Sequence, residues 1–540
     1  MKEFNITGSC FPDQHYMVDI GNRLERVKSL IDDGKYFCIN RGRQFGKSTT
    51  LEAVASDLAD KYFVIFLSFE GVGDAAFDGD TAFVLTFASK LKELIDEGVW
   101  ADPQGDFTAL LADLTKMPME EREAMMRCAS FIGKLVRAIP KPVVLLIDEV
   151  DQAGNHDSFI HFLALLRDRY LKRKRFATFQ SVILAGVYDI KNLKLKIRDP
   201  EEHQYNSPWN IAAPFDEDMT LSEEGIAGML RDYENDHHTG MDIALIAKLV
   251  RDYTGGYPFL VSRLCMLMDE QQNEKLKIEN GKCGDGEGVG GWNKEGFLAA
   301  VKAVLKEKST LFDDLIKKLD QFPRMHDMLA SILFNGEDIA FSAYTKEIDL
   351  ASMFSIIRDR NGKVAIHNRI FEIWLYNAFS SEMEMENRLY RNAAIEKPFF
   401  VKTDHTLDMP LILKRFAETF NDIYGDRDDR FREDEGRRYF MLYIKPIING
   451  VGNYYIEAET RDGTRTDMVI DYCGRRYVIE MKIWRGESYN QRGEEQLAKY
   501  LDYFKLDTGY MVSFCFNKNK APGLKDPIQV GTRTLVEVVV

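Results

Sequence analysis

The sequence predicts an α/β protein in which a doubly wound parallel sheet in the N-terminal part is followed by a second α/β domain at the C-terminus. Up to residue 187, short apolar segments alternate with helical patterns, as they do in parallel sheets whose strands are joined by helices. Residues 143–147 are wholly aliphatic, which indicates a strand buried on both faces. After residue 453, strands with charged residues at alternate positions indicate a sheet with different chemistry.

The elements of the N-terminal part are expected in a regular order. They are a strand at 36–39, a helix at 49–59, a strand at 63–68, helices near 81–97 and 121–138, a strand at 143–148, a helix at 158–170 and a strand at 181–187. From Leu221 the pattern is helical, and Gly255, Gly256 and Pro258 end one helix and start the next. This region is expected to be a helical lid.

Composition limits the class of protein. Of the 540 residues, 45% are hydrophobic and 29% charged, which is typical of a globular chain of several domains. The aliphatic run 143–147 is too short to span a membrane, and the seven cysteines show no paired spacing. We therefore expect a soluble, cytoplasmic protein without a membrane partner. Its oligomeric state is left open.

A net charge of −15 argues against a protein that coats nucleic acid non-specifically. Any contact with nucleic acid must then be local. The basic run Lys172-Arg173-Lys174-Arg175 is one candidate, although a solvated helix end is the commoner explanation of such a run.

A phosphate-binding loop is predicted between the first strand and the first of these helices. Residues 42–49 comprise Gly42, Arg43, Gln44, Phe45, Gly46, Lys47, Ser48 and Thr49. Backbone N–H groups of such a loop converge on a β-phosphate at the helix N-terminus. Lys47 would reach the β- and γ-phosphates, and Ser48 would ligate Mg²⁺. The usual loop begins with a glycine where this chain has Arg41.

Two carboxylates end the aliphatic strand downstream. Asp148 would bind in the Mg²⁺ shell, and Glu149 would polarise a water for attack on the γ-phosphate. Because ligands of α/β sheets bind at the carboxyl ends of strands, both residues are expected beside the loop. ATP and Mg²⁺ are the predicted cofactors.

The rest of the chain suggests further domains. A glycine-rich stretch is expected to be a linker, and helices followed by a hairpin at Asn361-Gly362 indicate a winged-helix-like module, which serves in other proteins either to bind DNA or as a lid or partner dock. The predicted domains are the ATPase core 1–215, the lid 216–280, the linker 281–293, the winged-helix-like module 294–380, a connector 381–405 and a C-terminal domain 406–540.

The C-terminal domain carries a second constellation. Glu480 and Lys482 are expected on one face of a strand, with Asp467 on the neighbouring strand. Two carboxylates and a lysine on one face are suited to Mg²⁺-dependent phosphodiester hydrolysis. A solvated hairpin face is the alternative. A later helix places Gln496 and Tyr500 one turn apart, where they could meet the same site.

Two resemblances follow from these motifs. Arg41 to Ser48, Leu145 to Glu149 and Thr254 to Pro258 resemble the bacterial AAA-ATPase-like proteins of the AAA+/STAND type, in which the first loop glycine is often displaced. Thr466-Asp467, Glu480-Met481-Lys482 and Gln496 resemble the PD-(D/E)XK nuclease superfamily, with a restriction-endonuclease-like α/β fold.

The second resemblance implies roles for individual residues. Asp467 and Glu480 would be metal ligands, Lys482 the catalytic lysine, Gln496 an accessory residue, and Glu435 a candidate for the acidic helix residue. Thr466 replaces the proline of the motif's name, and Glu433, Glu457 and Glu459 compete with Glu435.

The hypothesis is a P-loop ATPase coupled to a Mg²⁺-dependent nuclease-like domain that acts on nucleic acid, with DNA favoured, in defence or mobile-element control. One alternative is a nucleotide-gated switch whose C-terminal domain binds a ligand or DNA without cleaving it. Another is a DNA-binding regulator that works through the winged helix.

Overall fold

The computed structural model describes residues 2–102, 105–187, 209–280, 291–335, 337–384, 388–404, 406–424, 433–448, 452–459, 465–473, 475–483, 487–515 and 522–540. The chain divides into two units. The first comprises residues 1–321, 342–359 and 366–371, and the second comprises residues 322–341, 360–365 and 372–540. The six predicted domains stay a prediction.

A four-stranded parallel sheet lies at the centre of the first unit. Its strand order is β1-β4-β3-β2, and all neighbouring strands run parallel. The strands are β1 (Phe37–Asn40), β2 (Phe63–Ser68), β3 (Val143–Asp148) and β4 (Ser181–Gly186). The expected parallel sheet is confirmed, with each strand within one residue of its predicted bounds.

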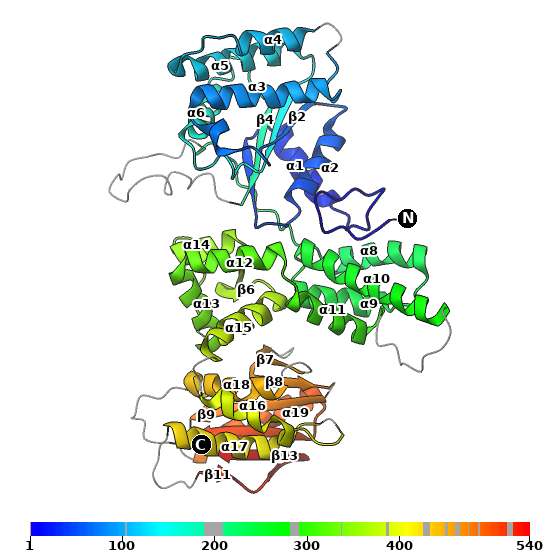
Figure 1. The fold of residues 1–540 in the computed structure, drawn as a ribbon, viewed down its shortest axis with the longest axis vertical. Helices are drawn as coiled ribbons and strands as arrows, with labels where there is room; N and C mark the ends of the chain where they lie inside the picture. Colours follow the sequence, from blue (N-terminus) through cyan, green and yellow to red (C-terminus); the bar gives the residue numbers. More distant parts are fainter. Residues whose placement is uncertain are drawn as a thin grey trace. The chain divides into compact units, whose positions relative to one another are not determined.

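Helices cover both faces of this sheet, as Figure 1 shows for α3 and α6 on one side and α1 and α2 on the other. Leu145 and Ile147 of β3 pack into the cluster that includes side chains of α3, α5 and α6, and the strand is buried throughout. Burial on both faces explains why β3 is wholly aliphatic before Asp148. The helices and the 3₁₀ turn are α1 (Gly21–Asp32), α2 (Lys47–Leu58), η1 (Asp74–Phe77), α3 (Asp80–Asp96), α4 (Asp106–Leu114), α5 (Glu121–Ala138) and α6 (Asp157–Leu171).

The first unit continues as a helical region. Gly255 and Gly256 have φ values of 58° and 74° and end α9, and Pro258 begins α10, as predicted. Residues 281–290 of the predicted linker lie outside the described residues. The helices are α8 (Glu223–His237), α9 (Ile243–Thr254), α10 (Pro258–Asn280), α11 (Lys294–Lys306), α12 (Thr310–Gln321) and α14 (Lys346–Met353).

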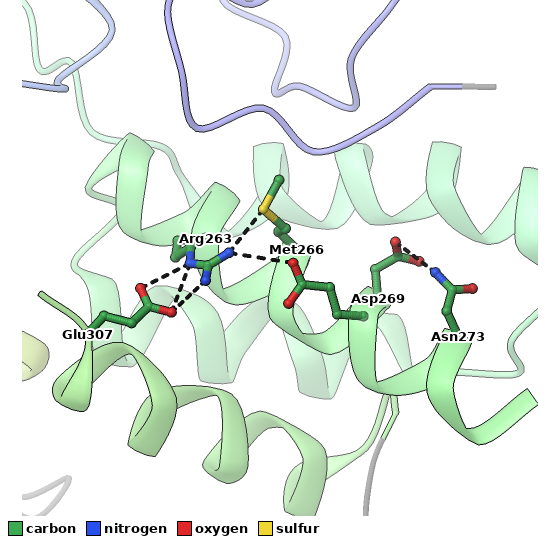
Figure 2. A network of polar contacts seen from close by, with 6 residues as sticks. Arg263, Met266, Asp269, Asn273 and Glu307 are labelled. Atoms are coloured by element: carbon green, nitrogen blue, oxygen red, sulfur yellow. Dashed lines mark hydrogen bonds and ion pairs between the residues drawn. The ribbon is translucent and has the colours of Figure 1, made fainter. Parts of the chain in front are cut away.

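A polar network joins α10 to the end of α11 (Figure 2). The Arg263 guanidinium donates to both carboxylate oxygens of Glu307, with an Nη2–Oε1 distance of 2.5 Å, and lies 3.7 Å from Glu270. Further along α10, Asn273 donates to Asp269. The Arg263 side chain is only 17% exposed, so its pairing with Glu307 fixes how the two helices pack.

A two-stranded sheet lies further along the chain. Its strands are β5 (Ile357–Arg360) and β6 (Lys363–Ile366). Asn361 and Gly362 between them both have positive φ, 55° and 80°, as in the tight hairpin turn that this dipeptide predicts. The flanking helices are α13 (Pro323–Asn335) and α15 (Arg369–Glu384).

The second unit is built on a larger mixed sheet of order β11-β13-β10-β9-β8-β7, with β12 paired to β13. Strands β7, β8 and β9 are antiparallel, whereas β9, β10 and β13 are parallel. The strands are β7 (Gly452–Glu459), β8 (Arg465–Tyr472), β9 (Arg475–Ile483), β10 (Thr508–Phe514), β11 (Gly523–Leu524), β12 (Ile528–Val530) and β13 (Arg533–Val539).

Helix α19 packs on one face of this sheet through Leu497, Tyr500 and Leu501. The ring of Phe514, which points to the other face, packs against Phe416 of α17. The helices of this unit after α15 are α16 (Arg388–Phe400), α17 (Met409–Tyr424), α18 (Glu433–Ile448) and α19 (Glu487–Phe504). Across the described residues of both units, no helix is long and apolar enough to cross a membrane.

The Arg263–Glu307 pair generates a prediction about stability. A double-mutant cycle of Arg263→Ala and Glu307→Ala should give a coupling free energy of about 1–2 kcal/mol in urea unfolding, because the pair is bidentate and mostly buried. The exposed pair Lys248–Asp252 of α9 is the control and should couple by less than about 0.5 kcal/mol. Equal couplings for the two pairs would contradict the structural role of Arg263.

Candidate nucleotide site and C-terminal acidic cluster

The predicted phosphate loop lies between the carboxyl end of β1 and the N-terminus of α2. Gly46 occupies the N-cap position of α2 with φ 79° and ψ 23°. This left-handed conformation favours glycine. Gln44 also has a positive φ, 57°. The loop therefore turns sharply and leaves the N-terminal N–H groups of α2 available for an anion.

Lys47 is the first residue of α2, and its ammonium folds back over the loop. Nζ donates to the carbonyl oxygens of Arg41 at 3.1 Å and Gly42 at 3.0 Å. The side chain is buried, and desolvation lowers the pKa of Lys47, while the charges of Glu149, Asp151 and Asp148 oppose that shift. The ammonium is thus held by neutral carbonyls, which phosphate oxygens can replace as partners.

Ser48 meets the end of β3, as the sequence predicts. Its hydroxyl donates to Oδ2 of Asp148 at 2.5 Å. The other carboxylate oxygen of Asp148 accepts from the backbone N–H of Glu149 at 2.9 Å. A hydroxyl and a carboxylate in this position are the oxygen donors that Mg²⁺ takes when phosphates supply further ligands.

Glu149 lies just beyond β3 with φ 51°, an unusual conformation for a residue with a side chain. Burial raises the pKa of Glu149, the charge of Lys47 opposes the shift, and Asp148 and Asp151 add to it. A carboxylate with a raised pKa is a better proton acceptor than an exposed one.

The remaining loop residues hold the loop against distant segments of the first unit. Tyr257 donates its hydroxyl to the Arg43 carbonyl, and the ring of Phe45 packs edge-on against Tyr257 at 4.8 Å between centroids. Gln44 donates to Thr310 at 3.2 Å. The Thr49 hydroxyl accepts from the backbone N–H of Cys10 at 3.1 Å.

Gly42 lies against the turn after α14. Its N–H donates to the Ser355 hydroxyl at 3.2 Å, and a Cβ at this position would come within 2.8 Å of the Phe354 carbonyl oxygen. The approach of the two backbones therefore requires glycine here.

Arg41 replaces the usual first glycine, and the structure gives it a separate role. Its guanidinium donates to the carbonyls of Asn40 at 2.8 Å and Glu217 at 2.7 Å. It thus fastens the segment before α8 to the loop. The Arg41 guanidinium is thus engaged with these two carbonyls.

Sequence reasoning missed several residues of this neighbourhood. Asp151 accepts from the backbone N–H of Val187 at 2.6 Å and ties the turn after β3 to the end of β4. His367 is buried beside Phe45 and Tyr257, with ring centroids 5.8 and 5.7 Å away. The signals for these contacts were weak, because they link segments far apart in sequence.

In the second unit, Glu480 and Lys482 of β9 form an ion pair of 2.8 Å. The Glu480 side chain is fully buried and that of Lys482 is 15% exposed. Ile479 and Met481, on the opposite face of the strand, are buried too, as expected. Because both faces are covered, the pair does not belong to a solvated hairpin face.

A second buried carboxylate, which sequence reasoning missed, lies on the same face of the sheet. Glu537 of β13 accepts from the Ser513 hydroxyl at 2.5 Å, and Ser513 is in register with Lys482. The register of β10 with β13 places Met511 opposite Glu537. Glu537 interrupts an aliphatic strand. The only sequence signal for its position was the alternation of side chains between the two faces of that strand.

The structure describes the side chains of only some of the other residues predicted for this cluster. Gln496 donates to the Tyr500 hydroxyl at 2.9 Å on α19. Asp467 lies on β8, one residue before Met468, which pairs with Ile479 of β9. The side chains of Asp467 and Glu435 lie outside the described residues. Among the side chains that are described, no group of three or more His, Cys, Asp or Glu residues is arranged to hold a metal.

Comparisons with known proteins add limited information. No family model matches the chain, and no curated protein matches it significantly. Among solved structures, a Walker-type ATPase of Pyrococcus abyssi is 13% identical, with 69% of this chain and 99% of that chain covered and a TM-score of 0.44.

Two Aeropyrum pernix proteins are also similar. The ORC2 protein in its ADPNP-ADP complexes is 11% identical, covers 71% of this chain and 97% of its own, and has a TM-score of 0.38. The ORC1 protein in complex with DNA is 12% identical, covers 68% and 94%, and has a TM-score of 0.31. At these scores the likenesses assign no activity to this chain. Its own parallel four-stranded sheet and loop geometry fit a P-loop ATPase.

The burial of His367 generates a prediction about pH. Burial lowers the pKa of His367 to about 4, and the positive charge of Arg358 adds to the shift. Between pH 6.5 and 4 the unfolded chain binds a proton that the folded chain excludes, so the stability from this group is complete above 6.5 and falls as the pH drops. The loss should reach roughly 3 kcal/mol near pH 4.

Other groups also titrate between pH 6.5 and 4, so the effect of His367 is measured as the difference between the pH profiles of the chain and of a variant. Urea unfolding of the chain and of His367→Phe, from pH 7.5 to 4.5, should show a smaller acid loss for the variant. His238→Asn is the control, because His238 is exposed. Parallel pH profiles for the chain and His367→Phe would show that His367 is not excluded from protonation.

Proposed function

We propose that the chain binds ATP with Mg²⁺ at residues 42–49 and hydrolyses it. The observation that supports this most directly is the buried Lys47 ammonium beside the Ser48–Asp148 hydrogen bond. The loop N–H groups and Lys47 bind the phosphates, and Ser48 and Asp148 hold Mg²⁺, which neutralises charge on the phosphates. Glu149 orients the attacking water and accepts its proton.

We further propose that the C-terminal α/β region is a nuclease-like domain that acts on nucleic acid, with DNA favoured. The buried Glu480–Lys482 pair on the same sheet as Asp467 supports this. Asp467 and Glu480 would bind the divalent cation, and Lys482 would stabilise charge that develops on the phosphate. Gln496 and Glu435 would have accessory roles.

A second candidate function is that of an ATPase whose C-terminal region does not cleave nucleic acid. In it the C-terminal region recognises a ligand or DNA, and the Glu480–Lys482 pair is structural. A buried ion pair is compatible with this hypothesis, because such pairs also occur in regions that only bind.

Two substitutions separate binding of ATP from its hydrolysis. Lys47→Ala should abolish ATP binding, because the site loses the buried ammonium that would contact the β- and γ-phosphates. Glu149→Gln should keep binding and lower kcat by about 10²–10⁴-fold, because only the proton acceptor is lost. Isothermal titration and phosphate release measure these effects. The control is Lys61→Ala on the exposed Lys61–Asp32 pair, which should change neither. Unchanged ATP affinity in Lys47→Ala would show that the site is elsewhere.

Metal dependence tests the C-terminal proposal. In full-length protein carrying Asp148→Asn, which removes the carboxylate of the nucleotide site, Mg²⁺ or Mn²⁺ should raise the melting temperature, because a ligand that binds the folded state stabilises it. Asp467→Ala should remove this shift. Lys482→Ala should keep the shift but abolish nicking of plasmid DNA.

Each variant is compared with its own metal-free melting temperature, because Lys482→Ala leaves the buried Glu480 without its ion pair and lowers stability by several kcal/mol. Glu495→Ala, an exposed position on α19, is the control. A chain that shows neither a metal-dependent shift nor nicking of DNA and RNA substrates would favour the ligand-binding alternative.

A further inference from the structure

The turn after α6 concentrates positive charge on the surface of the first unit. Lys172 to Arg175 form the longest run of consecutive cations in the sequence. All residues from Leu171 to Phe176 are exposed. The backbone N–H groups of Arg175 and Phe176 both donate to the Lys172 carbonyl, at 2.8 and 3.1 Å, so the segment is wound into a single turn. We call residues 171–176 the basic turn.

Two of the four cations fasten the basic turn to the protein. Lys172 pairs with Asp168 at 2.6 Å. Arg173 donates to the Gly34 carbonyl at 2.8 Å, and its guanidinium lies over the Tyr170 ring at 4.4 Å. In the described part of the chain, neither Lys174 nor Arg175 forms an ion pair.

A solvated helix end explains this arrangement only in part. The dipole of α6 is equivalent to roughly half an elementary charge, which favours one or two cations in the last turn. Four adjacent cations repel one another, and among the ion pairs of the described residues, Lys172–Asp168 is the one that offsets them. The surplus charge is suited to an external polyanion.

The two end residues of the basic turn indicate which of two polyanions, a membrane surface or a nucleic acid, it is suited to bind. Leu171 is 64% exposed and Phe176 is 46% exposed, and the Arg169 guanidinium lies over the Phe176 ring. Two isolated apolar side chains are much less than the apolar face that an interfacial helix buries in a membrane. A nucleic-acid backbone, which binds through phosphates and needs no such face, fits better.

The position of the basic turn leaves the nucleotide site free. It precedes the first residue of β4, whereas the phosphate loop follows the last residue of β1. Because β1 and β4 are parallel neighbours, the basic turn lies toward the amino ends of these strands and the phosphate loop toward their carboxyl ends. A polyanion on the basic turn would not compete with ATP for the loop.

We propose that the basic turn is a sequence-independent contact for the phosphodiester backbone of duplex nucleic acid. The inference rests on the proposed action of this chain on nucleic acid, and it names the surface that makes the contact. With a net charge of −15 the chain repels a polyanion overall, so binding needs a local cluster of this kind.

Salt-dependent binding tests the inference. Binding of full-length protein to a fluorescently labelled DNA duplex is measured by anisotropy between about 50 and 200 mM salt. Lys174→Gln combined with Arg175→Gln should reduce the slope of log K against log salt by about 0.9 per lost contact, so by about 1.8 in total. The control is Lys306→Gln combined with Lys308→Gln, the same charge change at exposed positions in and just after α11. It should leave the slope unchanged.

The outcomes of this experiment distinguish failure of the inference from failure of the proposed function. If the slope of the basic-turn variant equals that of the chain while ATP affinity and DNA binding persist, the inference is overturned and the proposed function stands. If the unmodified chain binds neither duplex DNA nor duplex RNA, the inference and the proposed action on nucleic acid both fail, and the ATPase proposal is unaffected. Binding to anionic phospholipid vesicles, lost in the basic-turn variant and without nucleic-acid binding, would replace nucleic acid by a membrane surface.

Discussion

The candidate nucleotide site depends on the parallel pairing of β1, β4 and β3. Ser48 and Asp148 are one hundred residues apart in the chain, and their side chains are 2.5 Å apart. β4 lies between the two strands and is in register with both of them. Because parallel strands present their carboxyl ends at one edge, the loop after β1 and the carboxylates after β3 must meet there.

The buried charge of Lys47 constrains the loop further. An ammonium taken out of water is stable only with hydrogen-bond acceptors around it, and the carbonyls of Arg41 and Gly42 provide them. Asp148 at the carboxyl end of β3 and Glu149 and Asp151 in the turn that follows stabilise the charged form of Lys47. Burial, together with the two aspartates, raises the pKa of Glu149. Structure and proton chemistry therefore depend on one compact set of charges.

Elsewhere, buried ion pairs serve different purposes. The pair between Arg263 and Glu307 connects two helices and has many hydrogen bonds. The pair between Glu480 and Lys482 is formed within one strand, and its carboxylate is fully buried.

The sequence by itself determined the strands and most helices of the parallel sheet, because hydrophobic periodicity and glycine or proline signals are local. It also placed Asp148, Glu480 and Lys482 on strands that the structure confirms, whereas Lys47 and Ser48, expected in the loop, are the first residues of α2. Their roles in binding and catalysis stay proposals.

Only the tertiary structure decided which distant segments complete each site. Tyr257 and Ser355 reach the loop from more than two hundred residues away, and Arg41 is committed to the Glu217 carbonyl. Glu537 joins the face of Glu480 through the pairing of β9, β10 and β13. Such contacts follow from strand order and helix packing, and no local pattern encodes them, because they depend on the energy of the whole core.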